Sequence, residues 1–551
     1  MSEQKMSKGL SPAVFALATA WVVAGAQSPA SAQSFSSATS GTGSAAASGA
    51  APNPTVALEA QLCRIDIRGD KKEQWMRLPR AESSVTSHRI NVAGKALDYT
   101  ATAGTEIVRD DEDKPIASIG YVAYTLRNEK GGTRPVTFAF NGGPGSSSLW
   151  LHMGVLGPRR VVVSDPDPTP PAPYHTVDNE YGLLDKSDLV MIDPVGTGLS
   201  RAVCDHKDEE FWAVDPDIDS ISRFIAQYLS DNNRWSAPKY LLGESYGTTR
   251  AAAIVNYLRE RRSLNFNGLM LVSVATDIEG IFAELPGNDR PYPVYLPGYA
   301  AVAWYHKALP QQPPALEPFL TEVRAYAMGP YTQALLKGDA LPESERDAVA
   351  DKMHEYTGLP VEYLKYANLR VSENMFAHEL LKPQRVTVGR LDGRFKGPTP
   401  DPLAKETDYD PQSAAISAAY AATFLDYYHG DLKFGQGETY RTTNFGIGEK
   451  WKWTHKTSQG DQPIVNSDVD LAEALMKDAG LRVLVLNGYY DLATPFSATE
   501  YFMSHLGVPP AVSARVHLTY YEAGHMMYVN PASIAKMKRD IDGFIDATDR
   551  H

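Results

Sequence analysis

Short apolar runs recur along the chain, and each is followed by glycine-rich or polar residues. Runs of this kind are typical of strands buried on both faces of a parallel sheet, with helices on each side. In such sheets the chemistry lies at the carboxyl ends of the strands. The pattern predicts parallel strands at residues 135–140, 188–192, 239–242, 269–274, 481–486 and 516–520.

Two other stretches follow different patterns. Residues 87–126 alternate apolar and polar positions around an acidic turn at 110–113, which predicts antiparallel hairpins. Helical periodicity punctuated by prolines dominates residues 281–430, with predicted helices at 316–328, 343–356, 371–381 and 413–428. The fold class expected is therefore α/β, with N-terminal hairpins, a catalytic domain over 57–280 and 431–551, and a mainly helical cap over 281–430.

The N-terminal segment has the composition of a secretory signal peptide. Lys5 and Lys8 precede an apolar run at 13–26, and small residues follow up to Ala32. We expect cleavage after Ala32 and a periplasmic or secreted protein; the alternative is a buried N-terminal helix. The run is too short for stable membrane insertion. Residues 33–56 are rich in Ser, Ala and Gly, which predicts a disordered linker.

The net charge and the number of cysteines exclude several classes of function. The 551 residues carry 53 Lys and Arg against 66 Asp and Glu, and a net charge of −13 does not favour nucleic acid as a partner. Two cysteines cannot build a zinc cage, and no HExxH motif is present, so neither a metal nor another cofactor is expected. In an oxidising compartment Cys63 and Cys204 are expected to pair; the alternative is two unpaired buried thiols.

A G-x-S-x-G motif lies between a predicted strand and a predicted helix. In this setting GESYG at 243–247 is a nucleophile elbow, which exposes the hydroxyl of Ser245 at the top of the sheet. The glycine-rich loop at 141–145 follows another strand. The backbone N–H groups of Gly143 and Tyr246 are the predicted oxyanion hole. The alternative of a phosphate-binding loop is disfavoured because the loop lacks the GKS/T ending of a P-loop.

Two further strand ends supply the remaining catalytic residues. Asp491 follows the strand predicted at 481–486, and His525 follows the last strand. The chain order Ser245, Asp491, His525 is that of α/β-hydrolases, in which the aspartate orients the histidine and the histidine activates the serine. The wide spacing between Ser245 and Asp491 accommodates the helical cap.

Five motifs in this order resemble the serine carboxypeptidase family, in its bacterial exported branch: NGGPGSSSLW at 141–150, DPVGTGLS at 193–200, GESYG at 243–247, NGYYDLATP at 487–495 and GHMMY at 524–528. The resemblance implies an α/β-hydrolase fold with an inserted cap and removal of C-terminal residues from peptide substrates. It also implies that Asn141, Gly142 and Glu244 hold the terminal carboxylate of the substrate.

The sequence departs from the family pattern at two positions. Ser146 stands where the family has a cysteine, and Val155 stands where it has a second carboxylate-binding glutamate. Arg159 or Arg160, which follow closely, are alternative ligands for a substrate carboxylate. An esterase or acyltransferase remains an alternative function, because an acyl-enzyme accepts any nucleophile. A third possible function is that of a catalytically inactive binding protein.

Overall fold

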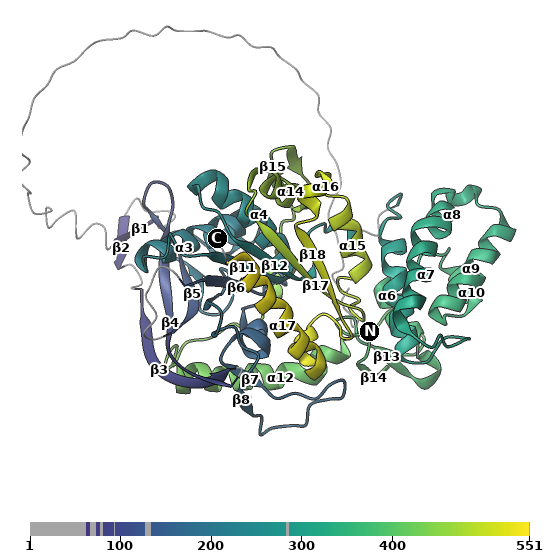
Figure 1. Cartoon of the computed structure of the whole chain (residues 1–551), viewed down its shortest axis with the longest axis horizontal. Coiled ribbons are helices and arrows are strands. Elements are labelled where there is room, and N and C mark those ends of the chain that lie inside the picture. The colour runs from purple at the N-terminus through teal and green to yellow at the C-terminus, as the bar shows by residue number, and fades with distance from the viewer. Residues whose placement is uncertain are drawn as a thin grey trace, which may run out of the picture.

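A ten-stranded mixed sheet forms the centre of the molecule (Figure 1). The computed structural model describes residues 62–66, 73–77, 81–92, 94–126, 134–282 and 286–549. The predicted signal peptide and linker lie outside the described residues. The sheet order is β18-β17-β12-β11-β6-β9-β5-β4-β3, with β10 beside β5. Its strands are β3 Ser83–Val92, β4 Lys95–Arg109, β5 Pro115–Leu126, β6 Val136–Phe140, β9 Asp188–Ile192, β10 Arg201–Ala202, β11 Lys239–Ser245, β12 Gly268–Val274, β17 Arg482–Gly488 and β18 Val516–Tyr521.

The strands change direction within this order as the sequence pattern predicts. β3, β4 and β5 pair antiparallel, which confirms the N-terminal hairpins. β9 pairs antiparallel with β5 but parallel with β6, and from there to β18 all neighbours are parallel. Each of the six predicted parallel strands is present, within a few residues of its expected bounds.

Alternate side chains of the central strands enter two apolar layers. Leu241, Leu271 and Val485 point into the layer beneath α3 (Val214–Asp231) and α4 (Tyr246–Arg262). Leu242 and Leu486 point into the opposite layer, which also contains the apolar face of α17 (Pro531–Thr548). Since both faces are covered, these strands read as continuous apolar runs in the sequence.

Most of the segment 281–430 forms a helical lobe at one side of the sheet, with α6 to α10 in it, whereas α12 lies apart from that lobe, in the apolar layer that also contains α17 (Figure 1). A short hairpin, β13 with β14, returns from this lobe toward the sheet. The elements of the segment are α6 Pro291–Tyr305, α7 Leu316–Tyr326, α8 Thr332–Leu336, α9 Glu343–Thr357, α10 Val361–Tyr366, α11 Glu373–Glu379, β13 Val386–Val388, β14 Lys396–Pro398 and α12 Pro411–Asp426.

Smaller elements complete the described part of the chain. Two-stranded pairs are β1 Leu62–Asp66 with β2 Glu73–Arg77, β7 Arg159–Val161 with β8 Thr176–Asp178, and β15 His455–Thr457 with β16 Gly460–Gln462. The other helices are α2 Leu149–Leu151, α5 Glu279–Phe282, α13 Phe445–Lys450, α14 Asp468–Lys477, α15 Phe496–Ser504 and α16 Pro510–Ser513. None of the helices in the described ranges is both long enough and apolar enough to span a bilayer.

Of the two cysteines in the predicted disulfide, the structure describes the side chain of one. Cys204, in the loop after β10, is disulfide-bonded. The side chain of Cys63, its predicted partner, lies outside the described residues. A disulfide that closed the loop between Cys63 and Cys204 would contribute up to about 4–5 kcal/mol of stability in the entropic treatment.

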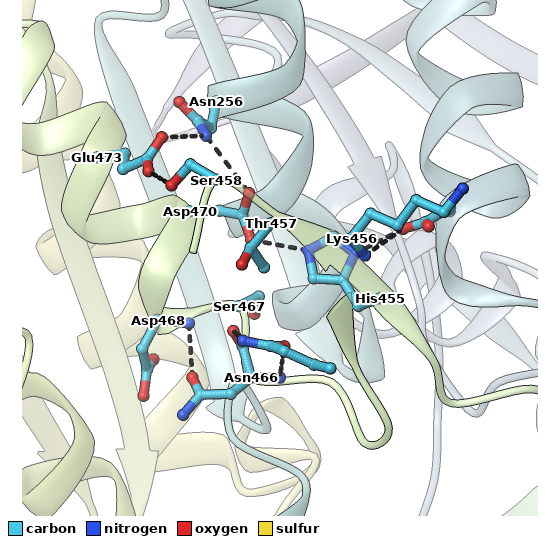
Figure 2. A network of polar contacts seen from close by, with 12 residues as sticks. Asn256, His455, Lys456, Thr457, Ser458, Asn466, Ser467, Asp468, Asp470 and Glu473 are labelled. Atoms are coloured by element: carbon cyan, nitrogen blue, oxygen red, sulfur yellow. Dashed lines mark hydrogen bonds and ion pairs between the residues drawn. The ribbon is translucent and has the colours of Figure 1, made fainter. Parts of the chain in front are cut away.

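The hairpin β15–β16 is joined to two helices by a buried histidine. His455 Nδ1 lies 2.6 Å from Asp215 Oδ1 at the start of α3, and its Nε2 lies 2.9 Å from Asp470 Oδ2 on α14. Figure 2 shows this ring pointing toward Asp470 within a wider polar network. Burial lowers the pKa of His455, but the two carboxylates outweigh burial and raise it to about 9.

We expect this histidine to make the stability of the protein depend on pH in the alkaline range. Because the folded-state pKa of His455 is about 9 against 6.5 for the free side chain, its contribution is complete below pH 6.5 and is lost as pH rises through 9. The size is on the order of 3 kcal/mol. The measurement compares thermal midpoints of wild type and His455→Gln between pH 6 and pH 10. A constant gap between the two proteins over this range would contradict the expectation.

Candidate active site

The strand–turn–helix predicted around Ser245 is present. β11 ends at Ser245, and α4 begins at the next residue. Ser245 has φ 60° and ψ −130°, a conformation that is strained for a residue with a side chain. The turn leaves its side chain partly exposed between a strand end and a helix start. This is the strained turn expected of an activated serine.

Asp491 and His525 lie together at the neighbouring strand ends. Their loops follow β17 and β18, which pair in parallel, so both loops emerge at the same edge. Asp491 Oδ2 lies 2.8 Å from His525 Nδ1. Asp491 is fully buried, and its other oxygen accepts the backbone N–H groups of Ala493 and Thr494 at 2.8 and 2.9 Å. The carboxylate is thus fixed in one orientation toward the imidazole.

The electrostatics of His525 suit a base held ready by a carboxylate. Burial lowers its pKa, but the charge and hydrogen bond of Asp491 outweigh burial, so the pKa is raised above its usual value. Because Nδ1 faces Asp491, Nε2 is left for the nucleophile. The hydrogen bonds of the described residues do not include one between His525 and the Ser245 hydroxyl. Such contacts are often longer without substrate and tighten when it binds.

The glycine-rich loop approaches the elbow closely. A Cβ atom on Gly142 would lie 2.5 Å from the Tyr246 nitrogen and 2.6 Å from the Gly247 nitrogen, so only glycine fits there. Tyr246 is the first residue of α4, where the N–H has no intrahelical acceptor. The next loop residue, Gly143, has φ +105°. The predicted oxyanion donors are therefore on two loops in direct contact.

Glu244 lies in a buried polar cluster beside the elbow. Asn141 Nδ2 donates to its Oε1 at 2.8 Å, and the hydroxyl of Tyr528 donates to its Oε2 at 2.7 Å. Burial raises the pKa of Glu244 to about 7, although nearby His525 and these two hydrogen bonds oppose the rise. Val155, at the position of the missing glutamate, is 1% exposed and belongs to an apolar cluster. The structure thus brings together Asn141 and Glu244.

The two arginines considered as alternative carboxylate ligands have partners elsewhere. Arg159 forms an ion pair with Asp178 and donates to Thr176 Oγ1 at 3.0 Å, both on β8. The guanidinium of Arg160 lies 5.9 Å from the centroid of the Tyr181 ring. Glu244, which contacts Asn141 directly, is therefore the better placed group.

Sequence reasoning did not assign roles to three polar side chains at this site. The Thr494 hydroxyl donates to Asp491 Oδ2 at 2.7 Å and lies 3.2 Å from His525 Nδ1. Tyr528 contacts Glu244, as described above. Both residues lie inside the quoted motifs. Their polar side chains, close in sequence to Asp491 and His525, were the signal from which a role at this site could have been predicted. Arg250 donates to the carbonyl oxygen of Asn141 at 2.8 Å and ties the glycine-rich loop to α4.

Within the described residues, no group of three or more His, Cys, Asp and Glu side chains could hold a metal ion. The arrangement instead offers a serine at an elbow, a histidine paired with a carboxylate, and backbone donors at the start of a helix. These are the parts required for acyl transfer through a covalent intermediate.

The sheet order, the elbow after β11 and the later strand-end loops define an α/β-hydrolase, and this confirms the predicted fold class. Residues 114–283 match the model of the serine carboxypeptidase family, which confirms the resemblance over that part of the chain and supports a serine carboxypeptidase-type hydrolase. No curated protein sequence matches this chain.

Solved structures similar to this chain have low sequence identity to it. Proline iminopeptidase from Mycobacterium smegmatis is 15% identical with a TM-score of 0.35, over 81% of this chain and 98% of that one. The peroxisomal α/β-hydrolase Lpx1 from Saccharomyces cerevisiae is 11% identical with a TM-score of 0.34, over 85% and 90%. Juvenile hormone epoxide hydrolase from Bombyx mori is 10% identical with a TM-score of 0.30, over 82% and 80%.

Proposed function

We propose that this chain is an exported serine carboxypeptidase that removes C-terminal residues from peptides through an acyl-enzyme on Ser245. The contact between Glu244 and Asn141 carries the proposal, because it places a carboxyl and an amide next to the serine of an elbow. The Asp491–His525 pair supplies the base.

In the proposed mechanism, His525 Nε2 removes the proton from the Ser245 hydroxyl as its oxygen attacks the scissile carbonyl. The N–H groups of Gly143 and Tyr246 stabilise the negative oxygen of the tetrahedral intermediate. Protonated His525 then gives its proton to the leaving amine, which departs as the C-terminal residue. A water molecule, deprotonated by His525, hydrolyses the acyl-enzyme and restores Ser245.

Recognition of the free C-terminus falls to the cluster around Glu244. A carboxyl group donates a hydrogen bond to another carboxylate only when it is protonated, and a pKa of about 7 keeps Glu244 largely neutral under mildly acidic conditions. Asn141 and Gly142 add neutral donors. The missing second acid at Val155 removes one such contact.

We expect the pH profile of peptidase activity to be a narrow bell. The value of kcat/KM should rise as His525 loses its proton and fall as Glu244 ionises near pH 7. Glu244→Gln should remove the alkaline fall. It should also move the acid limb to lower pH, because the charge of Glu244 raises the pKa of His525. The measurement is kcat/KM of both proteins on a blocked dipeptide from pH 4 to pH 9. Superimposable profiles would rule out Glu244 as the carboxylate ligand.

An esterase is the second candidate, and Val155, an apolar residue at the position where the family has its second glutamate, favours it. Three substrates separate the two: a blocked dipeptide with a free C-terminus, its amide, and its ethyl ester. A carboxypeptidase releases the terminal residue of the first and leaves the amide largely intact. Turnover of the ester alone would support the esterase.

A further inference from the structure

A turn of the cap lies against the loop that carries Asp491. The turn, residues 389–394, lies between β13 and β14. Two backbone hydrogen bonds connect it to that loop: Leu492 N–H to the carbonyl of Arg390 at 3.0 Å, and Gly393 N–H to the carbonyl of Tyr490 at 2.8 Å. The cap therefore contacts the catalytic aspartate loop on both sides of Asp491.

The same turn holds the loop that carries His525. The His525 N–H donates to the carbonyl of Leu391 at 2.6 Å, and the Gly524 N–H donates to Asp392 Oδ2 at 2.9 Å. A Cβ atom on Gly524 would lie 2.4 Å from both the Leu391 carbonyl oxygen and the Asp392 Cβ. Glycine is thus required at position 524 for the turn to come this close.

A buried chain of charges extends from Asp392 to the far end of the His525 loop. Arg394 Nε and Nη2 donate to the Asp392 carboxylate at 3.0 and 2.6 Å, and Nη1 and Nη2 donate to Asp165 at 3.1 and 2.7 Å. Asp165 Oδ2 in turn accepts from Asn530 Nδ2 at 2.7 Å, and Asn530 caps the start of α17. These contacts bridge the segment 524–530 from end to end.

The desolvation cost of this buried ion cluster points to a role other than stability. The side chain of Asp392 is fully buried, and those of Arg394 and Asp165 are 4% and 6% exposed. Removing such charges from water costs about as much as their attraction returns, so a buried ion cluster is a weak source of stability. What it provides is fixed geometry, because each member has bidentate or multiple partners.

We propose that Asp392, held in place by Arg394 and Asp165, is a positioning residue that fixes His525 relative to Asp491 and Ser245. The inference rests on the proposed function, since it assigns a role within that triad. Asp392 itself contacts neither the imidazole nor the serine; it acts through the backbone of Gly524. A displacement of about 1 Å at a catalytic group costs about 100-fold in rate, so the loop must be held tightly.

Asp392→Asn tests the role, because it keeps an acceptor for Gly524 but removes the charge that holds Arg394. We expect kcat to fall by about 10–100-fold with KM nearly unchanged, since the carboxylate ligands are untouched. The rate of Ser245 labelling by a fluorophosphonate should fall by a similar factor. The low-field proton resonance of His525 Nδ1 should broaden as the Asp491 contact loosens.

Asp165→Asn is a milder variant that remains informative if Asp392→Asn fails to fold. It loosens only the outer contacts, to Arg394 and Asn530, so we expect a smaller loss of kcat in the same direction. The matched control is Asp289→Asn, which breaks a bidentate ion pair at 2.7 Å with Arg370, a cap residue whose other hydrogen bonds go to the carbonyl oxygens of Asn368 and Leu335. This control should lower the thermal midpoint and leave kcat as in wild type.

The labelling experiment separates the two proposals. If wild-type Ser245 is labelled, and folded Asp392→Asn and Asp165→Asn are labelled and turn over substrate at the wild-type rate, the positioning role is overturned while the proposed function stands. If wild-type Ser245 is not labelled at all, the proposed function fails, and the role assigned to Asp392 fails with it. A parallel loss of kcat and labelling in both variants, absent from Asp289→Asn, is the supporting result.

Discussion

Replacing Ser245 with alanine is expected to reduce kcat by about 10⁴–10⁶-fold while the protein stays folded. The hydroxyl is the only group of the proposed mechanism that forms a covalent bond with the substrate. Its removal leaves the strained turn intact, because alanine also carries a Cβ atom and places the same demand on the backbone. Turnover of a blocked dipeptide, with circular dichroism as the test of folding, measures the loss.

A second serine provides the control for that experiment. Ser222 on α3 is 1% exposed, and its hydroxyl has no hydrogen-bond partner among the described residues. Ser222→Ala should keep full activity and, like wild type, should incorporate one equivalent of fluorophosphonate, whereas Ser245→Ala should incorporate none. Covalent labelling at a different serine would show that the elbow has been assigned wrongly.

Asp491→Asn is expected to cost about 10⁴-fold in kcat. The buried carboxylate accepts three hydrogen bonds from Ala493 and Thr494 besides facing His525 Nδ1. An amide that presents its NH₂ group to Nδ1 would favour the wrong tautomer of the imidazole and leave a proton on Nε2. The measurement is kcat against pH, and raising the pH should not restore the loss.

Asp470→Asn is the matched control, because Asp470 is also a buried carboxylate paired with a histidine ring nitrogen, His455 Nε2. We expect this variant to unfold at a lower temperature and, below that temperature, to match the kcat of wild type. Equal losses of kcat in both aspartate variants would indicate general destabilisation and argue against a catalytic role for Asp491.

The sequence predicted those features that depend on neighbours along the chain. Buried strands appear as apolar runs, and the candidate catalytic side chains lie at or just after their ends, so β11 with Ser245 and β17 with Asp491 could be located from residue order alone. The helices 316–328 and 343–356 were found for the same reason, since their apolar periodicity is local.

Contacts between distant segments could not be predicted in this way. Tyr528 and Glu244 are 284 residues apart, and no spacing rule joins a tyrosine after the last strand to a glutamate in the elbow. Leu391-Asp392-Gly393-Arg394 has the composition of an ordinary exposed turn, because Asp-Gly is a common turn sequence. That Asp392 is fully buried against Gly524 follows only from the three-dimensional path of the cap.

The position of the cap turn between the loops of Asp491 and His525 also bears on when the proposed active site can form during synthesis. His525 leaves the ribosome 280 residues after Ser245, which at typical elongation rates is a delay of roughly 15–60 s. Until then the nascent chain carries the proposed nucleophile without its proposed base. Residues 389–394 are already made by that time, but they have no His525 loop to hold. The proposed active site can therefore be assembled only after His525 has been made, and shorter nascent chains are expected to have no peptidase activity.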